Sequence, residues 1–298
     1  MCKSYEQKIR MNCKDGASDA LRDNSIDTIS TAIGEIDISD DEDDEDDNLF
    51  QESPPPKEDC EICFRPMPYA SEMCGVNPIY HPCCGKMLCA GCVKVSLDEM
   101  DKGNLKRWCP FCRIPLQTSD KEYIERVKKR MKLDEAEAFY ELGHAYKAGT
   151  FGLPKNRNKA FELYNQAAEL GSIKAHYELA TCLYHGKSGV EKDKKKAIQH
   201  YKLAAIGGHE RARYLLGIIE MSNGNTDLAM KHYIIGAKSG EEDSLKKVGL
   251  GYKAKVVSKD EYAKTLRAYQ SSRDEMKSKQ RDAVIEECNA ECKQLNSK

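Results

Sequence analysis

The feature that most constrains this chain is a cluster of cysteines between residues 60 and 112. Nine of the fourteen cysteines in the 298-residue sequence fall in this stretch. Three pairs are separated by two residues: Cys60 and Cys63, Cys89 and Cys92, and Cys109 and Cys112. This spacing lets both thiolates of a tight loop reach one tetrahedral zinc ion, and three such pairs in order indicate a metal-binding module.

A disulfide framework is the other common use of so many cysteines. Residues 1–10 carry no apolar run of the length that an export signal needs, which argues against an oxidising compartment. No stretch approaches the roughly eighteen apolar residues that cross a bilayer. We therefore expect an intracellular protein, cytoplasmic or nuclear, that keeps its cysteines reduced.

The cysteine-rich stretch, residues 60–113, resembles a RING finger, a small α+β module built around zinc. The resemblance lies in Cys60-Glu-Ile-Cys63, Cys84-Gly-Lys-Met-Leu-Cys89-Ala-Gly-Cys92 and Cys109-Pro-Phe-Cys112-Arg113. In RING fingers the ligand pairs interleave, so the resemblance implies two zinc ions. It implies one ligand set at Cys60, Cys63, Cys89 and Cys92, and a second set made of a middle pair with Cys109 and Cys112. The metal ions would replace a hydrophobic core, which about fifty residues are too few to build.

The middle ligand pair departs from the common RING pattern. That pattern places a histidine two residues after the third cysteine, where this sequence has Lys86, a poor zinc ligand. The missing ligand is either Cys83, adjacent to Cys84 as in an eight-cysteine RING variant, or His81, which restores a two-residue spacing. We favour Cys83 because thiolate binds zinc well, and keep His81 as the alternative. Cys74, in the first spacer, is expected to stay unligated.

The first 59 residues are acidic, with eighteen acidic and six basic side chains, although the whole chain has a net charge of −2. They include a solid acidic run at 40–47, a triple proline at 54–56 and only two aromatic residues. Such a composition cannot bury enough apolar surface to offset the loss of chain entropy. We predict that residues 1–59 form a disordered acidic tail.

One motif inside the acidic tail indicates a binding role. Ile33, Ile36 and Ile38 stand among small and acidic residues directly before the acidic run, as in a strand that adds to the edge of a partner's sheet. The segment resembles a SUMO-interacting motif, which makes residues 33–47 a candidate site for a SUMO-like modifier. Ser39, which acidic residues follow, also resembles a site for an acidophilic kinase.

After the cysteines the sequence turns helical and repeats itself. Ser119 precedes an apolar pattern that begins at Tyr123, and we expect it to cap a helix. Two successive copies coincide at an offset of 37 residues: Leu142 with Leu179, Gly149 with Gly186, Gly152 with Gly189, Ala160 with Ala197, Tyr164 with Tyr201, and Gly171 with Gly208. A third copy follows at an offset of 32, with Ala229, Tyr233, Ala237 and Gly240.

Each copy has the length of two helices and a loop, which predicts an all-α solenoid of helix pairs over residues 120–275. The pattern resembles the Sel-1-like repeat, a relative of the tetratricopeptide repeat. The third copy lacks the glycine loop, and a fourth from Glu241 is degenerate. Residues 276–298 are predicted to form a charged C-terminal helix or tail.

Aromatic and histidine residues in the repeats invite a functional interpretation that their spacing does not favour. Tyr164, Tyr201 and Tyr233 recur with the repeat, as core residues between stacked helices do. His144, His176 and His185 have no acidic or cysteine partner at ligand spacing. The chain also lacks a nucleotide-binding loop and paired carboxylates for catalysis, and its positive charges lack the interleaved aromatics that favour nucleic acid. We expect neither a catalytic residue nor nucleic-acid binding.

The RING resemblance implies a ubiquitin ligase that recruits a ubiquitin-conjugating enzyme and uses the solenoid to bind substrate or scaffold proteins. It places the contacts with the conjugating enzyme at Ile62, Leu97, Pro110, Phe111 and Arg113. Arg113 would be the cation that bridges the conjugating enzyme and ubiquitin. The alternative is a zinc-binding adaptor without enzymatic function.

Overall fold

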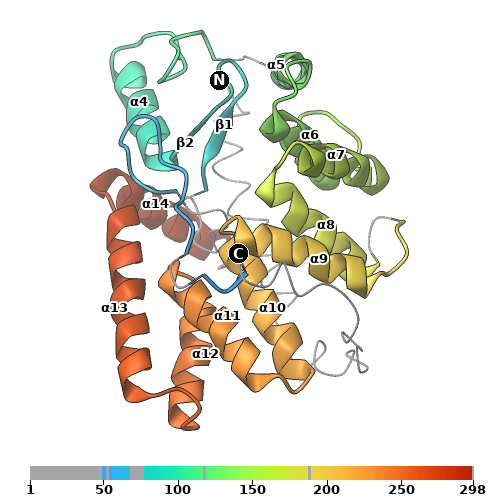
Figure 1. Ribbon diagram of the computed structural model, residues 1–298. Helices are drawn as coiled ribbons and strands as arrows, with labels where there is room; N and C mark the ends of the chain where they lie inside the picture. Colours follow the sequence, from blue (N-terminus) through green and yellow to red (C-terminus); the bar gives the residue numbers. More distant parts are fainter. Residues whose placement is uncertain (1–48, 52–53, 68–76, 117–118, 187–188, 297–298) are drawn as a thin grey trace. The chain divides into compact units, whose positions relative to one another are not determined.

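The computed structural model describes residues 49–51, 54–67, 77–116, 119–186 and 189–296 (Figure 1). These residues form two compact units, which are described separately. The first unit contains the chain from Lys57 to Ala175 and from Met276 onward, and the second contains the chain from His176 to Glu275 and the segment that ends at Pro56. The candidate modifier site at 33–47 and Cys74 lie outside the described residues.

The cysteine-rich stretch contains a short hairpin. Strand β1 (Ile79–His81) pairs antiparallel with strand β2 (Lys86–Leu88). The turn closes where the amide of Gly85 donates to the carbonyl oxygen of His81 at 2.9 Å. Gly85 has a φ of 73°, a conformation that glycine adopts without strain, so the sequence fixes the turn at this residue.

One helix, α4 (Ala90–Lys102), follows the hairpin directly. Val93 and Leu97 lie four residues apart on one face of α4 and are buried in a core with Ile79 and Leu88 of the hairpin. The core is small, and three of the clustered cysteines belong to it. Figure 1 shows α4 beside the hairpin.

Three further helices complete the main part of the first unit. They are α5 (Asp120–Met131), α6 (Ala136–Ala148) and α7 (Arg157–Glu169). The expected cap of the first helix is confirmed, because the Ser119 hydroxyl accepts the amide of Glu122 at 3.2 Å. Tyr80 of the hairpin is fully buried in the same core as Tyr123 and Leu142. The hairpin of the cysteine module therefore contributes a buried side chain to the core of the first helices.

The chain returns to the cysteine module at its C-terminal end, where α14 (Lys279–Asn296) packs against α4. Gly91 makes this approach possible, since a Cβ atom there would lie 2.7 Å from the backbone nitrogen of Arg281. Val284 of α14 is 2% exposed and belongs to the core of the cysteine module. The charged helix expected at residues 276–298 is present as α14, but its contact with α4 was not predicted.

The remaining helices follow one another in pairs. They are α8 (Ile173–His185), α9 (Lys194–Ile206), α10 (Glu210–Ser222), α11 (Thr226–Lys238), α12 (Glu242–Lys253) and α13 (Lys259–Met276). Gly171, Gly208 and Gly240 each follow the second helix of a pair with a positive φ of 88° to 94°, as a helix stop requires. The predicted solenoid of helix pairs is confirmed.

The recurring tyrosines are core residues, as expected. Tyr164, Tyr201 and Tyr233 are each no more than 1% exposed. A Cβ atom at Gly143 would lie 2.9 Å from the Tyr164 ring, and one at Gly217 would lie 2.5 Å from the Tyr233 ring. The glycine that follows leucine in these copies therefore makes room for the tyrosine of the same helix pair.

The prediction of a disordered tail through residue 59 is wrong at its C-terminal end. Leu49 is 2% exposed and belongs to a core cluster of the second unit. This contact could not be predicted from composition, because a single leucine hardly changes the composition of an acidic stretch. Within the described residues, no helix combines the length and apolarity needed to span a membrane.

Candidate metal centre

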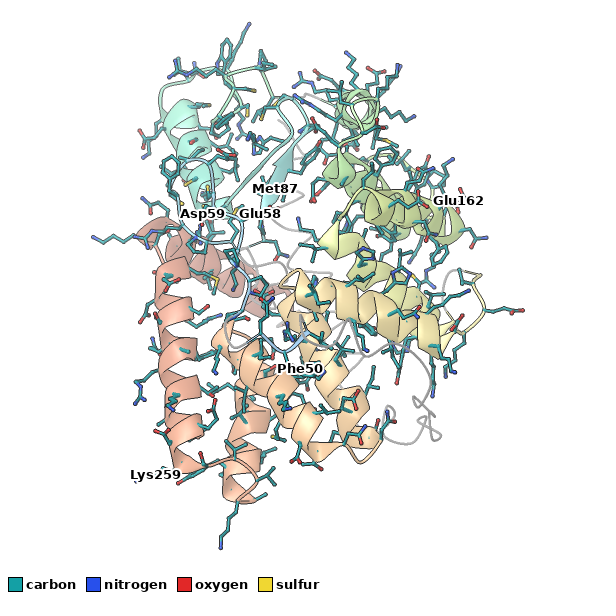
Figure 2. The ribbon with its side chains drawn as sticks, in the orientation of Figure 1. Phe50, Glu58, Asp59, Met87, Glu162 and Lys259 are labelled. Carbon is teal, nitrogen blue, oxygen red and sulfur yellow. The ribbon has the colours of Figure 1, made fainter. Side chains whose placement is uncertain are left out.

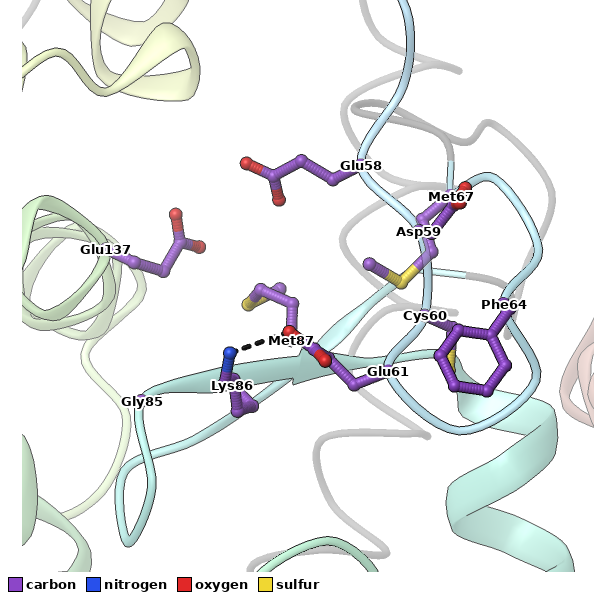
Figure 3. A pocket seen from close by; sticks show the side chains of 10 residues that line it. All are labelled: Glu58, Asp59, Cys60, Glu61, Phe64, Met67, Gly85, Lys86, Met87 and Glu137. Carbon is purple, nitrogen blue, oxygen red and sulfur yellow. Dashed lines mark hydrogen bonds and ion pairs between the residues drawn. The ribbon is translucent and has the colours of Figure 1, made fainter.

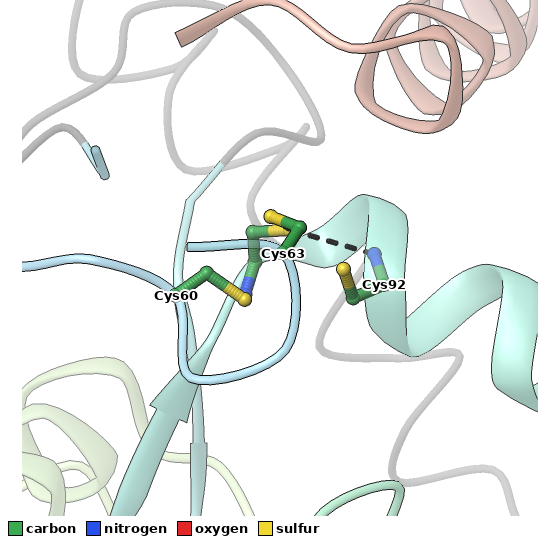
Figure 4. Close-up of side chains that lie close together, drawn as sticks. Cys60, Cys63 and Cys92 are labelled. Carbon is green, nitrogen blue, oxygen red and sulfur yellow. Dashed lines mark hydrogen bonds between the residues drawn. The ribbon is translucent and has the colours of Figure 1, made fainter. Parts of the chain in front are cut away.

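Four cysteines from two distant loops meet in a first group. Its members are Cys60, Cys63, Cys89 and Cys92, whose sulfur atoms all lie within 4.8 Å of one another. Figure 4 shows the side chains of Cys60, Cys63 and Cys92 close together. The Cys63 and Cys89 sulfurs are 3.8 Å apart, and the amide of Cys92 donates to the Cys89 sulfur at 3.4 Å. The N-terminus of α4 thus stabilises negative charge on this group.

A second group of four cysteines lies at the turn of the hairpin. Its members are Cys83, Cys84, Cys109 and Cys112, whose sulfur atoms also all lie within 4.8 Å of one another. The Cys84 and Cys109 sulfurs are 3.9 Å apart, and those of Cys83 and Cys112 are 3.5 Å apart. The ligand pairs that lie apart in sequence therefore interleave in space.

Both groups have the geometry of a tetrahedral metal site. A zinc–sulfur bond of about 2.3 Å places the sulfurs of a tetrathiolate about 3.8 Å apart. The sulfur–sulfur distances of 3.5 to 3.9 Å match this value and exclude disulfides between these atoms. All eight cysteines are free. The two groups could therefore each hold one metal ion.

In each group, one sulfur accepts hydrogen bonds from neighbouring thiols. The Cys89 thiol lowers the pKa of Cys60 to about 4. In the second group, the Cys83 and Cys84 thiols likewise lower the pKa of Cys109. In each group the lowered pKa of one thiol favours its thiolate, which is the form that coordinates metal.

His81, the alternative ligand, is fully buried beside the second group. Its Nδ1 atom lies 3.5 Å from the Cys109 sulfur, whereas Cys83 completes the group of four sulfurs. This arrangement favours Cys83 as the ligand, with His81 hydrogen-bonded to a ligand sulfur. Such contacts orient the ligands of a metal site without binding the metal.

Two loops, residues 60–66 and 109–115, have the same backbone geometry, and we call them the first and second knuckle. In each, the amide of the residue after the second cysteine donates to the carbonyl oxygen of the first cysteine, at 2.8 Å for Phe64 and 3.0 Å for Arg113. Both residues have positive φ values, 51° and 59°. The knuckles therefore place their tip residues in equivalent positions.

Lys86 stands at the position where many RING fingers have a histidine ligand. Its side chain contacts residues of the two knuckles and not the cysteine sulfurs. Its Nζ atom forms an ion pair of 2.7 Å with Glu61 at the tip of the first knuckle. The same atom lies 5.7 Å from the ring centroid of Phe111 at the tip of the second knuckle. Lys86 therefore connects the two knuckle tips, which explains why a lysine is compatible with this position.

Arg281 of α14 contacts the first cysteine group, and this contact was not predicted from the sequence. The side chain is 2% exposed, and its guanidinium donates to the carbonyl oxygens of Pro66 at 2.7 Å, Met276 at 2.8 Å and Arg65 at 3.2 Å. Its Nη2 atom also lies 3.6 Å from the Cys63 sulfur. The C-terminal helix thus supplies a buried cation to the first group. An arginine in a charged helix gives no sequence signal of this role.

The residues expected to contact a conjugating enzyme lie in three kinds of environment. Phe111 and Arg113 are exposed, with Phe111 at 41%. Ile62 and Pro110 are half-buried at the knuckle tips. Leu97 is only 5% exposed and belongs to the core of the module, so its side chain is not available to bind a partner.

A shallow hollow of about 410 Å³ lies beside the second knuckle. Its lining residues are Ser96, Met100, Leu105, Trp108, Cys109, Pro110 and Arg113. Leu105 and Trp108 are large apolar side chains that are 63% and 39% exposed. The second knuckle and the outer face of α4 thus offer an apolar surface with a cation at its edge.

A second hollow, of about 490 Å³, borders the first knuckle and β2 (Figure 3). Four acidic residues line it, Glu58, Asp59, Glu61 and Glu137, together with Lys86. Two of these carboxylates are paired, Glu61 with Lys86 and Glu137 with Lys174, each at 2.7 Å. The hollow carries an excess of negative charge and does not suit an anionic ligand.

The chain was also compared with known proteins. Residues 136–172 and 173–209 match the family model of the Sel1 repeat, which confirms the 37-residue period. A search of curated proteins gave no significant match.

Two solved structures show a similar kind of repeat. A Sel1 repeat protein from Oxalobacter formigenes is 28% identical, with 42% of this chain and 96% of that chain covered and a TM-score of 0.39. The protective antigen c5321 of uropathogenic Escherichia coli, which displays an SLR fold, is 19% identical, with 67% of this chain and 44% of that chain covered and a TM-score of 0.39. This chain therefore spans less than half the length of the antigen.

Proposed function

We propose that this protein is a RING-type ubiquitin ligase that holds two zinc ions and binds its protein partners through helical repeats. The observation that carries the proposal is the pair of interleaved cysteine groups, each with the geometry of a zinc tetrathiolate. The zinc ligands would be Cys60, Cys63, Cys89 and Cys92 in one site, and Cys83, Cys84, Cys109 and Cys112 in the other. Zinc in such sites constrains the fold and takes no part in bond-making.

The surface proposed to bind a ubiquitin-conjugating enzyme consists of the two knuckle tips and the hollow beside the second knuckle. Ile62 directly precedes the ligand position Cys63 and Pro110 directly follows the ligand position Cys109, so the metal would hold these apolar side chains at the surface. Phe111 adds an exposed aromatic ring next to Lys86. Large apolar side chains of this kind are the usual anchors of a protein interface.

Arg113 is proposed to stabilise the complex with the conjugating enzyme and not the fold of the module. Its side chain is exposed, and no acidic side chain of the described residues pairs with it. A free guanidinium at the edge of an apolar surface can form bidentate hydrogen bonds with a carbonyl or carboxylate group of a bound partner. The ligase itself would contribute no covalent catalyst, since bond-making occurs on the conjugating enzyme.

The helical repeats would supply the second binding surface. Stacked helix pairs form extended surfaces that commonly bind protein segments. The Sel1 repeats at 136–172 and 173–209 therefore support a role in holding substrate or scaffold proteins. The proposal for residues 33–47, binding of a SUMO-like modifier, rests on the sequence motif alone.

The test is a ubiquitin-transfer assay with the full chain and a panel of charged conjugating enzymes. We expect self-modification with at least one enzyme, and at least a tenfold slower transfer for Ile62→Ala with its zinc content unchanged. Val95→Ala is the matched control, because Val95 is also apolar and is 42% exposed on α4, outside the proposed surface. Transfer with no enzyme of the panel, from a chain that holds its zinc, would favour the adaptor function.

A further inference from the structure

The acidic N-terminal segment ends in a contact with the second unit. Leu49 is 2% exposed and belongs to a cluster formed by side chains of α8, α9 and α10. The cluster includes Ala180, Ile198, Tyr201, Ala204, Ala205, Ala212, Leu216 and Ile219. Four of these eight are alanines, whose small side chains leave room for the leucine. Burial of a leucine side chain contributes about 2 kcal/mol.

A buried cation holds the backbone of the same segment. Arg213 of α10 is 4% exposed, and its Nη1 atom donates to the carbonyl oxygen of Leu49 while Nη2 donates to that of Ala205 at 3.1 Å. Burial lowers the pKa of Arg213 to about 10. Among the described residues, no carboxylate forms an ion pair with it. A buried guanidinium that serves a peptide carbonyl is suited to bind any chain segment in this position.

Phe50, which is labelled in Figure 2, lies against two side chains of α11. Its ring centroid lies 4.9 Å from that of His232 and 5.5 Å from the Lys231 Nζ atom. His232 is 2% exposed, and its Nδ1 atom has no hydrogen-bond partner among the described residues. A buried ring nitrogen without a partner is costly, so this site has an unused capacity to bind a polar group.

The charges of the site and the segment are opposite. Lys231 and Arg213 contact the segment directly, and Lys202 contributes to the positive potential at His232. In the sequence, the acidic run at residues 40–47 is separated from Leu49 by one residue, Asn48. Opposite charges guide a segment to its site and fix its direction. The described contact has two parts, an aliphatic anchor and an aromatic ring, and in the sequence an acidic run precedes them.

We propose that this place is a peptide-binding site, which the chain's own Leu49 and Phe50 occupy. Its partner would be an acidic segment of another protein that ends in an aliphatic and then an aromatic residue, and this segment would displace Leu49 and Phe50. The inference rests on the helical repeats and is independent of the ligase activity. Two side chains and one carbonyl group make the contact, which is few enough for a partner to replace.

The experiment measures binding of a fluorescein-labelled peptide of residues 40–56 to the full chain. A tethered segment competes at an effective concentration on the order of 1 mM, and short acidic peptides bind with a Kd of roughly 10–100 μM. Removing the tethered competitor with the double substitution Leu49→Ala and Phe50→Ala should therefore strengthen peptide binding about 10- to 100-fold. A peptide with the same two substitutions is the matched control and should not bind.

Arg213→Met in the double-substituted chain should weaken binding of the unmodified peptide at least tenfold. The proposal is overturned if the double-substituted chain melts cooperatively but binds the two peptides equally or binds neither. If that chain does not fold, hydrogen exchange of the unmodified chain decides the matter. Excess peptide should then remove the amide protection of residues 49–51, and unchanged protection at saturating peptide would show that the segment is a fixed part of the core. Neither peptide binding nor hydrogen exchange requires ligase activity, so both measurements test the peptide-binding site even if the chain transfers no ubiquitin.

Discussion

Substitution of Arg281 by methionine is expected to weaken metal binding by the first cysteine group. The second group should keep its metal affinity. Arg281 lies 3.6 Å from the Cys63 sulfur and reaches the first knuckle through the carbonyl oxygens of Arg65 and Pro66. A zinc ion with four thiolates carries a net charge of about −2, so a buried cation beside it stabilises the metal-bound form. The second group has His81 beside Cys109 instead, and among the described residues no hydrogen bond joins Arg281 to it.

The size of the effect follows from two contributions. Loss of an outer-shell partner typically weakens metal binding 10- to 100-fold, which equals about 1.4 to 2.7 kcal/mol. Hydrogen bonds from a charged donor contribute about 1.5–3 kcal/mol each, although water can replace the donor at carbonyls near the surface. The guanidinium serves three carbonyls, so we expect Arg281→Met to lower the free energy of unfolding by about 3–5 kcal/mol in total.

The assay is zinc transfer to a coloured chelator, followed together with thermal unfolding. The unmodified protein should release two zinc ions slowly, whereas Arg281→Met should release one of them 10- to 100-fold faster. Lys279→Met is the control, because Lys279 is exposed on the same helix two residues earlier. Equal release by both variants, even with a lower melting temperature for Arg281→Met, would refute the electrostatic argument and leave Arg281 a purely structural role.

Three further predictions concern other parts of the chain. Elemental analysis should find two zinc ions per chain and one in Cys83→Ser, while His81→Ala should keep both; the reverse pattern would make His81 the ligand. Burial lowers the pKa of His232 from 6.5 to about 3, so the unfolded chain binds more protons below pH 6.5. The free energy of unfolding should therefore fall by about 2 kcal/mol from pH 7 to pH 5 relative to His232→Gln, as urea titrations can measure; equal pH dependence would contradict this. A labelled peptide of residues 30–50 should bind SUMO at micromolar to tens of micromolar concentration, and the same peptide with Ile36→Ala and Ile38→Ala should not; equal titration curves would leave this segment a linker.

The repeats could be predicted from sequence because their signal is spread over many positions. A period of 37 residues fixes where each helix pair begins, and glycine, alanine and tyrosine recur at the same place in each copy. Each copy of the pattern is an independent observation of the same packing. The burial of Tyr164, Tyr201 and Tyr233 follows from the same regularity.

The contacts that sequence reasoning missed depend on single residues far apart in the chain. Arg281 reaches Pro66, and Leu49 reaches Arg213, across 215 and 164 positions. Neither arginine nor leucine is distinguished from the residues around it by spacing or composition. The two groups of four cysteines, by contrast, could be predicted. Two-residue spacing is a local signal, and the interleaving of the pairs followed from the RING resemblance.

These long-range contacts change how the cysteine module should be understood. A segment of about fifty residues that folds around metal ions is expected to be independent of its neighbours. In this chain, however, Tyr80 of the hairpin is buried with α5 and α6, and Arg130 of α5 donates to the carbonyl oxygens of Pro82 and Cys83 at 3.2 Å and 2.6 Å. The second cysteine group is thus supported by α5, as the first group is supported by α14. Because each group has a partner outside the module, separation of residues 57–116 from the rest should expose both groups and make metal loss easier than in the full chain.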